Sequence, residues 1–241
     1  EIRGLMVTGF LTSAGSQGDG IVITNSSNNV VAGNYIGTNG TLDLGNVGDG
    51  VDINGTSTGN VIGGTAAADR NVISGNNQDG IELRLGASGN VVIGNYIGVA
   101  ADGTTALANL NGIFVNEAGA NTIGGNTAAG ERNVISGNSV DGIRIDGEAS
   151  DANVVRGNYI GLAADGTAAL GNGQTGVAIL NGADDNVVGG AGLGRNIISS
   201  NGNTGISVTT AGTSGTTIRN NYIGTDVGGT LDRGNTNQGI F

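Results

Sequence analysis

Short stretches in which apolar residues alternate with other residues recur along the chain at a nearly constant interval. Each begins with a glycine followed by apolar–x–apolar, and the starting glycines lie 29 to 34 residues apart. The stretches are 20–23, 50–53, 80–83, 112–115, 142–145, 176–179, 205–208 and 239–241. Alternation with a period of two predicts β-strands with one buried face. The residues expected to point inward are Ile21, Ile23, Val51, Ile53, Ile81, Leu83, Ile113, Val115, Ile143 and Ile145, and those expected to point outward are Val22, Asp52, Glu82, Phe114, Arg144, Ala178 and Ser207.

Each interval of about 31 residues holds two further short apolar runs. The second run begins with asparagine at 29–31, 60–62, 90–92, 121–123, 153–155 and 186–188, and with threonine at 216–218. The third run alternates between two kinds. One is Tyr-Ile-Gly, at Tyr35, Tyr96, Tyr159 and Tyr222; the other is Asn-Val-Ile-Ser-Gly-Asn at 71–76 and 133–138, with a variant at 196–201. The tyrosines are 61, 63 and 63 residues apart, so the sequence repeats every two intervals.

Repetition at a fixed period is typical of a solenoid, in which each unit buries its apolar face only by stacking on its neighbours. Three strands per interval and about seven intervals predict an all-β, three-stranded parallel β-helix with two alternating types of coil. At the usual strand spacing of about 4.8 Å, the coils would rise about 35 Å along the axis. We expect residues 1–241 to form a single domain.

The asparagines that open the second strands predict a ladder of side chains along one corner of the coil. A side-chain amide can hydrogen-bond the turn backbone and the equivalent amide one coil above and below. Asparagine also tolerates the left-handed backbone conformation of tight turns, and glycine is suited to corners for the same reason. The ladder is expected to contain Asn29, Asn60, Asn90, Asn121, Asn153 and Asn186.

These repeats resemble the right-handed parallel β-helix repeats of the pectate-lyase-like superfamily over nearly the whole chain. The likeness is closest to the N-V-I-x-G-N and N-x-I-G-T runs of large bacterial secreted and surface proteins. The resemblance implies a right-handed coil and an extracellular or cell-surface location. It does not specify a function, because this architecture occurs in lyases, glycoside hydrolases, epimerases, adhesins and stalks.

The composition excludes several chemistries. The chain has no cysteine and no histidine, and its nine basic residues are all arginine. Thiol nucleophiles, histidine-based triads, Schiff-base lysines and Cys/His zinc sites are therefore impossible. A net charge of −11 argues against a nucleic-acid partner, and no apolar run approaches the roughly 18 residues of a membrane span. The chain starts at Glu1 without a methionine, which suggests processing or excision from a longer protein.

Asp52 and Glu82 are the strongest catalytic candidates. They occupy the outward middle position of adjacent first strands, so their backbones should lie about 5 Å apart. Two carboxylates about 5–5.5 Å apart suit a retaining glycosidase. Arg84 and Arg144 lie along the same face, where they could bind an anionic sugar. The alternative is a solvated strand face with no catalytic role. The histidine-containing segment and the calcium-binding carboxylate cluster of related enzymes have no counterpart here.

Asp19, Asp49 and Asp79 each precede the glycine of a first strand and should form a column of carboxylates. Such a column repels itself unless Ca²⁺ neutralises it or backbone N–H groups satisfy it. Later coils carry Asn111, Thr175, Thr204 and Gln238 at this position, and these side chains share hydrogen-bond acceptance with aspartate rather than charge. Turn capping is therefore the favoured interpretation, and a structural Ca²⁺ is the alternative. No other cofactor is expected.

The four tyrosines should point outward, because Ile36, Ile97, Ile160 and Ile223 follow them and should point inward. They could bind a ligand by stacking, or each ring could cover the long loop that follows it, which is the interpretation we favour. Arg70, Arg132 and Arg195 precede the Asn-Val-Ile or Asn-Ile-Ile runs. For them we expect ion pairs with the neighbouring Asp69 and Glu131 and hydrogen bonds to loop carbonyls.

The uniform repeats favour a non-enzymatic structural or adhesive protein, such as a surface stalk, an adhesin or a filament building block. No coil departs from the pattern as a catalytic cleft would require, and acid–base residues are sparse. The alternative is a polysaccharide-active enzyme or a carbohydrate-binding module. Neither end carries an evident polar cap, and uncapped solenoids pair through their edges. This predicts either a segment of a longer chain or head-to-tail stacking of copies.

Overall fold

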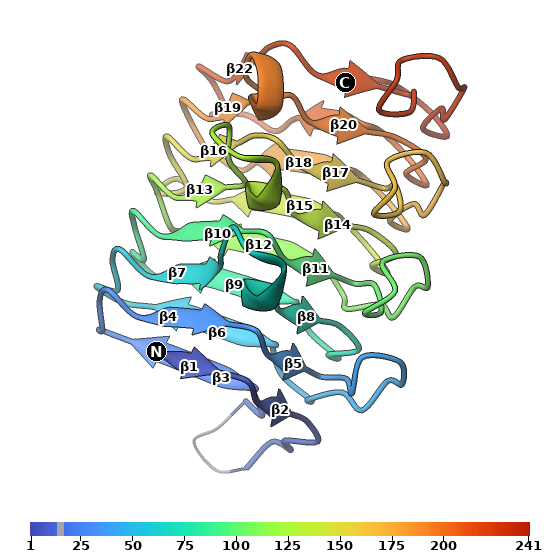
Figure 1. Ribbon diagram of the computed structural model, residues 1–241. Coiled ribbons are helices and arrows are strands. Elements are labelled where there is room, and N and C mark those ends of the chain that lie inside the picture. Colours follow the sequence, from blue (N-terminus) through green and yellow to red (C-terminus); the bar gives the residue numbers. More distant parts are fainter. Residues whose placement is uncertain (14–16) are drawn as a thin grey trace.

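The computed structural model describes residues 1–13 and 17–241, which form a stack of three-stranded coils (Figure 1). Each coil contributes one strand to each of three sheets, and neighbouring strands within a sheet are parallel. Within the described residues, helix is limited to three single turns of 3₁₀ type: η1 (Ala67–Asp69), η2 (Ala129–Glu131) and η3 (Gly192–Gly194). The predicted all-β, three-stranded parallel β-helix of about seven coils is thus confirmed.

The three sheets are named here by the order in which a coil supplies their strands. Sheet 1 contains β3 (Ile21–Thr24), β6 (Val51–Asn54), β9 (Ile81–Arg84), β12 (Ile113–Asn116), β15 (Ile143–Asp146), β18 (Val177–Leu180) and β21 (Ile206–Val208). Sheet 2 contains β1 (Ile2–Arg3), β4 (Val30–Ala32), β7 (Val61–Gly63), β10 (Val91–Ile93), β13 (Thr122–Ile123), β16 (Val154–Val155), β19 (Val187–Val188) and β22 (Thr217–Ile218). Sheet 3 contains β2 (Met6–Val7), β5 (Tyr35–Ile36), β8 (Val72–Ile73), β11 (Tyr96–Ile97), β14 (Val134–Ile135), β17 (Tyr159–Ile160), β20 (Ile197–Ile198) and β23 (Tyr222–Ile223).

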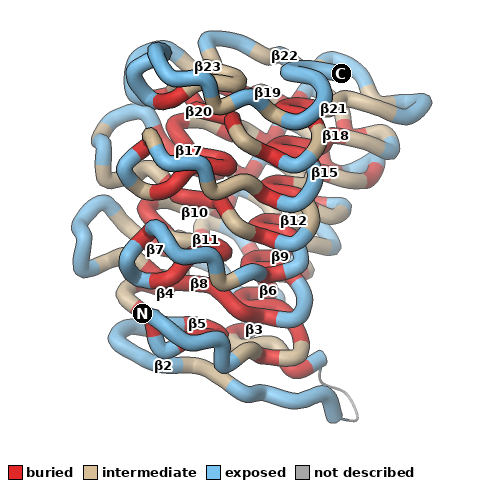
Figure 2. The backbone as a smooth tube through the Cα atoms, turned by 90° about the vertical axis from the view of Figure 1, so that its right-hand side faces the viewer, coloured by how far each residue is buried: buried red, intermediate tan, exposed pale blue. Residues whose placement is uncertain are grey.

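The hydrophobic core runs along the inside of the coils, where Figure 2 shows a continuous column of buried backbone. All ten first-strand residues predicted to point inward are at most 8% exposed. They pack with the isoleucines and valines of sheets 2 and 3 in one cluster. The part of the chain that the structure describes contains no helix whose length and hydropathy would carry it through a membrane.

The two predicted coil types are present and differ around sheet 3. Coils with a tyrosine strand continue into a long loop, whereas the coils between them place η1, η2 or η3 before the strand. Each long loop is hydrogen-bonded to the long loop two coils away: Ala101 N donates to Gly40 O at 2.8 Å, and Ala164 N donates to Gly103 O at 2.9 Å. The structural unit is therefore a pair of coils, as the 63-residue spacing indicates.

The predicted asparagine ladder is confirmed. Between Asn29 and Asn153, the side-chain amide of each member donates to Oδ1 of the next member, at 2.9 to 3.3 Å. The last step is made by the backbone N–H of Asn153, which donates to Asn186 Oδ1 at 2.9 Å. In Asn60, Oδ1 accepts two bonds from Asn29, and Nδ2 donates to Asn90 Oδ1 and Ser26 O. The buried amide therefore uses its full capacity of two acceptor and two donor bonds.

Two more asparagine ladders follow the other two corners of the coil, and the sequence analysis missed both. Within each, the amide-to-amide distance is 2.9 to 3.2 Å. One leads into sheet 3 and contains Asn34, Asn71, Asn95, Asn133, Asn158, Asn196 and Asn221; the other follows sheet 3 and contains Asn46, Asn76, Asn109, Asn138, Asn172, Asn201 and Asn235. Their sequence signal is the asparagine at both ends of Asn-Val-Ile-Ser-Gly-Asn.

The backbone explanation for the ladder asparagines was wrong. The left-handed conformation belongs to the residue before them, such as Asn28 with φ 60° and Ala120 with φ 57°, so the ladder positions are fixed by hydrogen bonding alone. The glycine that opens each first strand is also not left-handed. A Cβ added to Gly50 would lie 2.6 Å from both Gly80 O and Ile73 Cγ2, so close approach between coils excludes any side chain there.

Adjacent asparagines provide a test of the ladder. Replacing Asn76 with alanine removes bonds to Asn46, Asn109 and Ile36 and leaves buried polar groups unpaired, so we expect the free energy of unfolding to fall by about 2–4 kcal/mol. Asn77 is exposed, and Asn77→Ala should cost less than about 0.5 kcal/mol. Urea denaturation of the two variants measures both changes. Equal effects would show that the ladder contributes nothing specific.

Candidate functional site

The outward face of sheet 1 is the surface on which the coils differ most. Its middle positions carry Val22, Asp52, Glu82, Phe114, Arg144, Ala178 and Ser207. Val22 is 52% exposed, but Asp52 is 1% exposed and Glu82 is 9% exposed. The face is therefore not a solvated surface at the two catalytic candidates, because neighbouring charged and polar side chains cover them.

Asp52 and Glu82 are brought together as predicted, and Arg84 lies between them. The two residues are direct partners in the β6–β9 register. Arg84 donates from Nε and Nη2 to the two oxygens of Asp52, at 3.0 and 2.8 Å, and its Nε lies 3.1 Å from Glu82 Oε2. Asn54 Nδ2 also donates to Asp52 Oδ2 at 2.7 Å. Both oxygens of Asp52 are thus engaged, and Arg84 is not free to bind an anionic sugar. A catalytic role for the pair stays a prediction.

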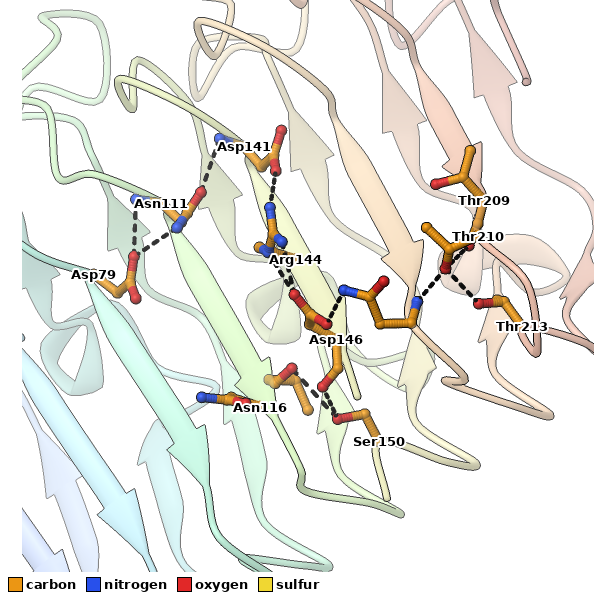
Figure 3. Close-up of polar contacts among 12 residues, drawn as sticks. Asp79, Asn111, Asn116, Asp141, Arg144, Asp146, Ser150, Thr209, Thr210 and Thr213 are labelled. Carbon is orange, nitrogen blue, oxygen red and sulfur yellow. Dashed lines mark hydrogen bonds and ion pairs between the residues drawn. The ribbon is translucent and has the colours of Figure 1, made fainter. Parts of the chain in front are cut away.

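Arg144 is also held by its neighbours (Figure 3). It forms an ion pair with Asp146 at 2.7 Å, and its Nη1 lies 3.9 Å from Asp141. Its Cζ is 5.8 Å from the centroid of the Phe114 ring, which is within the range of a cation–π contact. Arg84 and Arg144 thus each form an ion pair with a neighbouring carboxylate, and a ligand-binding role for them stays a prediction.

The aspartate column caps the backbone of the next coil, as the favoured interpretation predicts. Asp19 Oδ1 accepts from Asp49 N at 2.9 Å, and Asp49 Oδ1 accepts from Asp79 N at 2.8 Å. Asp79 Oδ1 then accepts from Asn111 N, and Figure 3 shows this chain continuing from Asn111 to Asp141. The shared property of the column is hydrogen-bond acceptance.

The described residues contain no group of three or more Asp, Glu, His or Cys side chains placed to hold a metal ion. The structural Ca²⁺ at Asp19, Asp49 and Asp79 stays a prediction. Melting temperatures with and without EDTA decide it.

A pocket of about 500 Å³ opens beside this column, contrary to the prediction that no coil forms a cleft. We call it the acidic pocket. Its walls are Asp49, Asp79, Glu82 and Phe114, with Thr12, Gln17, Val47, Gly48 and Gln78. The sequence analysis placed its carboxylates in separate groups, although Glu82 lies only three residues after Asp79. An alignment of the first strands of adjacent coils places Asp49, Asp79 and Glu82 close to one another, and this is the sequence signal for the pocket.

Burial perturbs the carboxyl groups of the acidic pocket. Burial, reinforced by the charge of Glu82, raises the pKa of Asp49 to about 8. Burial likewise raises the pKa of Asp79 and that of Glu82, the latter opposed by the charge of Arg84. A carboxyl group that stays protonated near neutral pH, as Asp49 does, can donate a hydrogen bond or a proton, so this pocket has acid–base capacity.

The tyrosine column lies against the long loops, in agreement with the interpretation that each ring covers the loop that follows it. A Cβ added to Gly103 would be 2.9 Å from Tyr96 Cε2, and one on Gly166 would be 2.8 Å from Tyr159 Cζ. Tyr159 is 5% exposed and packs in a second small cluster with Val99, Val134, Leu162 and Ile197, whereas Tyr35 is 39% exposed. A ligand-binding role for the tyrosines stays a prediction.

The expected ion pairs of Arg70, Arg132 and Arg195 were wrong. Asp69 pairs with Arg3 at 3.0 Å, and Glu131 caps the turn that precedes it. The three guanidinium groups lie instead over the tyrosine rings of the next coil, with Cζ to centroid distances of 4.1 Å for Tyr96, 4.2 Å for Tyr159 and 4.0 Å for Tyr222. The expected carbonyl bonds form in two cases: Arg132 Nε donates to Gly157 O, and Arg195 Nε donates to Asn220 O.

Comparison with known proteins adds little to this description. No protein-family model matches the sequence, and no curated protein is significantly similar to it. A solved structure that it resembles is that of a double mutant of the periplasmic alginate epimerase AlgG, with 16% sequence identity and a TM-score of 0.42. The match covers 92% of this chain and 46% of the epimerase, so this chain spans less than half of that protein. A likeness of this size carries no argument about activity.

The acidic pocket predicts an unusual pH dependence of stability. The folded chain keeps the Asp49 proton up to about pH 8, whereas an unfolded chain releases it near the ordinary value of 3.8. The folded state therefore binds more protons between these limits, and the free energy of unfolding should fall as the pH rises, by at most about 1.4 kcal/mol per pH unit for one proton.

Urea denaturation between about pH 5 and about pH 8 measures this slope. Asp49→Asn keeps an acceptor for Asp79 N and should flatten the slope. The pKa of Asp102 is lowered by backbone N–H bonds, so Asp102→Asn should leave the slope in place. An unchanged slope in Asp49→Asn would refute the assignment.

Proposed function

We propose that this chain is a non-enzymatic structural segment of an extracellular or cell-surface protein, serving as a stalk, an adhesin or a filament building block. The observation that carries the proposal is the set of three asparagine ladders. They connect successive coils along all three corners with nearly constant geometry. A rod built in this way is suited to holding a fixed length and direction.

The charged groups of sheet 1 support this proposal. Asp52, Arg84, Arg144 and Asp146 pair with one another, so no ligand is needed to satisfy them. The resemblance of the repeats to those of large secreted and surface proteins supports the extracellular location.

A second candidate function is the binding or cleavage of a polysaccharide. The acidic pocket favours it, because carboxyl groups with raised pKa lie beside the ring of Phe114. Carboxyl groups can hydrogen-bond sugar hydroxyls, and a protonated one can serve as a general acid. Asp49 is the residue we would assign that role.

The proposal also includes head-to-tail association of copies of this chain. Among the described residues, β1, β2 and β3 each lack a partner strand on one edge at one end of the stack, and so do β22 and β23 at the other end. Exposed parallel edges can pair with another chain. The partner would be a second copy stacked head to tail on this one.

Incubation with a panel of acidic and neutral polysaccharides, with and without Ca²⁺, separates the two functions. The structural proposal predicts no new reducing ends and no unsaturated products under any condition. Cleavage that is lost in Asp49→Asn or Asp52→Asn, but kept in the exposed control Glu148→Gln, would establish the second candidate instead.

Sedimentation over a wide range of concentrations tests the stacking. We expect association to increase with concentration and to weaken in Thr217→Lys, which puts a charge on the exposed side of the edge strand β22. A chain that stays monomeric throughout would rule out head-to-tail assembly.

A further inference from the structure

The arginine–tyrosine column is irregular at its first member. Tyr96, Tyr159 and Tyr222 each pair with a strand residue of the preceding coil. In each case the arginine that lies over the tyrosine ring stands two residues before that strand residue in the sequence. The strand residue that pairs with Tyr35 is Met6, and Gly4 stands two residues before it. Tyr35 therefore has no arginine above it, which explains why it is the most exposed of the four rings.

The same region contains an arginine, Arg70, whose side chain has no hydrogen-bond partner among the described residues. Arg132 donates from Nε to Gly157 O at 3.2 Å and from Nη1 to the Tyr159 hydroxyl at 3.0 Å, and Arg195 donates from Nε to Asn220 O at 3.2 Å. The side chain of Arg70 makes no hydrogen bond or ion pair with any residue that the structure describes, and its Nε is buried. A buried donor without an acceptor costs about 1–3 kcal/mol, so this group calls for an explanation.

Tyr35 and Arg70 face a common pocket of about 270 Å³. Its other walls are the backbone and small side chains of Gly33, Ala67, Ala68 and Ala101, with Val72 and Asn34. The carboxylate adjacent in the sequence, Asp69, is paired with Arg3, and no ion pair is formed between it and Arg70. The pocket thus combines a guanidinium that no carboxylate neutralises, an accessible aromatic ring and walls that are mainly polar, with small apolar areas at the alanines.

We propose that the Tyr35–Arg70 pocket binds a carboxylate carried on a single small ring. The guanidinium would donate to the two carboxylate oxygens, which is the geometry that this fork favours. The ring of the ligand would lie against Tyr35 and the alanine side chains. A volume of about 270 Å³ is ample for one six-membered ring that carries a carboxylate, since a cavity of about 150 Å³ already holds benzene. This inference is independent of the structural function proposed above.

Titration with benzoate, followed by the arginine Nε–H signals in a nitrogen–proton correlation spectrum, tests the site. The Arg70 signal should move saturably, while those of Arg132 and Arg195, which already have acceptors, should not. Benzamide, which has the same shape but no charge, should move nothing. Cyclohexanecarboxylate distinguishes a carboxylate on a saturated ring from one that needs an aromatic ring.

Two variants and a matched control complete the test. Arg70→Gln should weaken benzoate binding at least about tenfold, and Tyr35→Ala at least about threefold, whereas Arg132→Gln should leave it unchanged. If Arg70→Gln does not fold, the wild-type titration and Tyr35→Ala still decide the matter. The proposal is overturned if the Arg70 signal does not respond, if benzamide acts equally, or if Arg132→Gln abolishes binding as well.

Discussion

Each coil of this protein is joined to the next by side-chain amides that accept and donate at the same time. An amide carries both functions without charge, so the same side chain can be repeated on every coil. The aspartate column shows the contrast. It also caps one backbone N–H per coil, but burial of its charged groups is unfavourable, and burial together with the charge of Glu82 raises the pKa of Asp49. After Asp79 the column contains one further carboxylate, Asp141, and is otherwise continued by the uncharged Asn111, Thr175 and Thr204, whereas the asparagine ladders repeat the same side chain.

The ladders also explain why the charged face of sheet 1 can vary. Because the corners fix the position of each strand, the outward side chains are not needed to hold the coils in register. Val22, Asp52, Phe114 and Ala178 can therefore occupy equivalent positions. Variation at such positions is where a pocket can form without a change in the fold, and the acidic pocket lies beside Asp49 and Glu82 on this face.

Much of this architecture follows from the sequence, because burial and alternation are local properties. Strand order, inward residues and the pairing of Asp52 with Glu82 all follow from the position of each residue within its coil. The partners of long side chains do not. Arg84 reaches back to Asp52 rather than outward, and Arg132 reaches the ring of the next coil rather than the adjacent Glu131. Several charged groups lie within reach of one flexible arginine side chain, and the partner is determined by the three-dimensional arrangement rather than by the spacing in the sequence.

The hydrogen bonds between long loops restrict how such a protein can change in length. Because the loop at Gly40 contacts the loop at Ala101 across an intervening coil, loss or gain of a single coil would place unlike loops side by side. Loss or gain of a coil pair would keep like loops side by side and the asparagine ladders continuous. Unequal crossing-over within a gene of this kind is therefore tolerated in steps of about 63 codons, and the parity of the coil number becomes an inherited property of the rod.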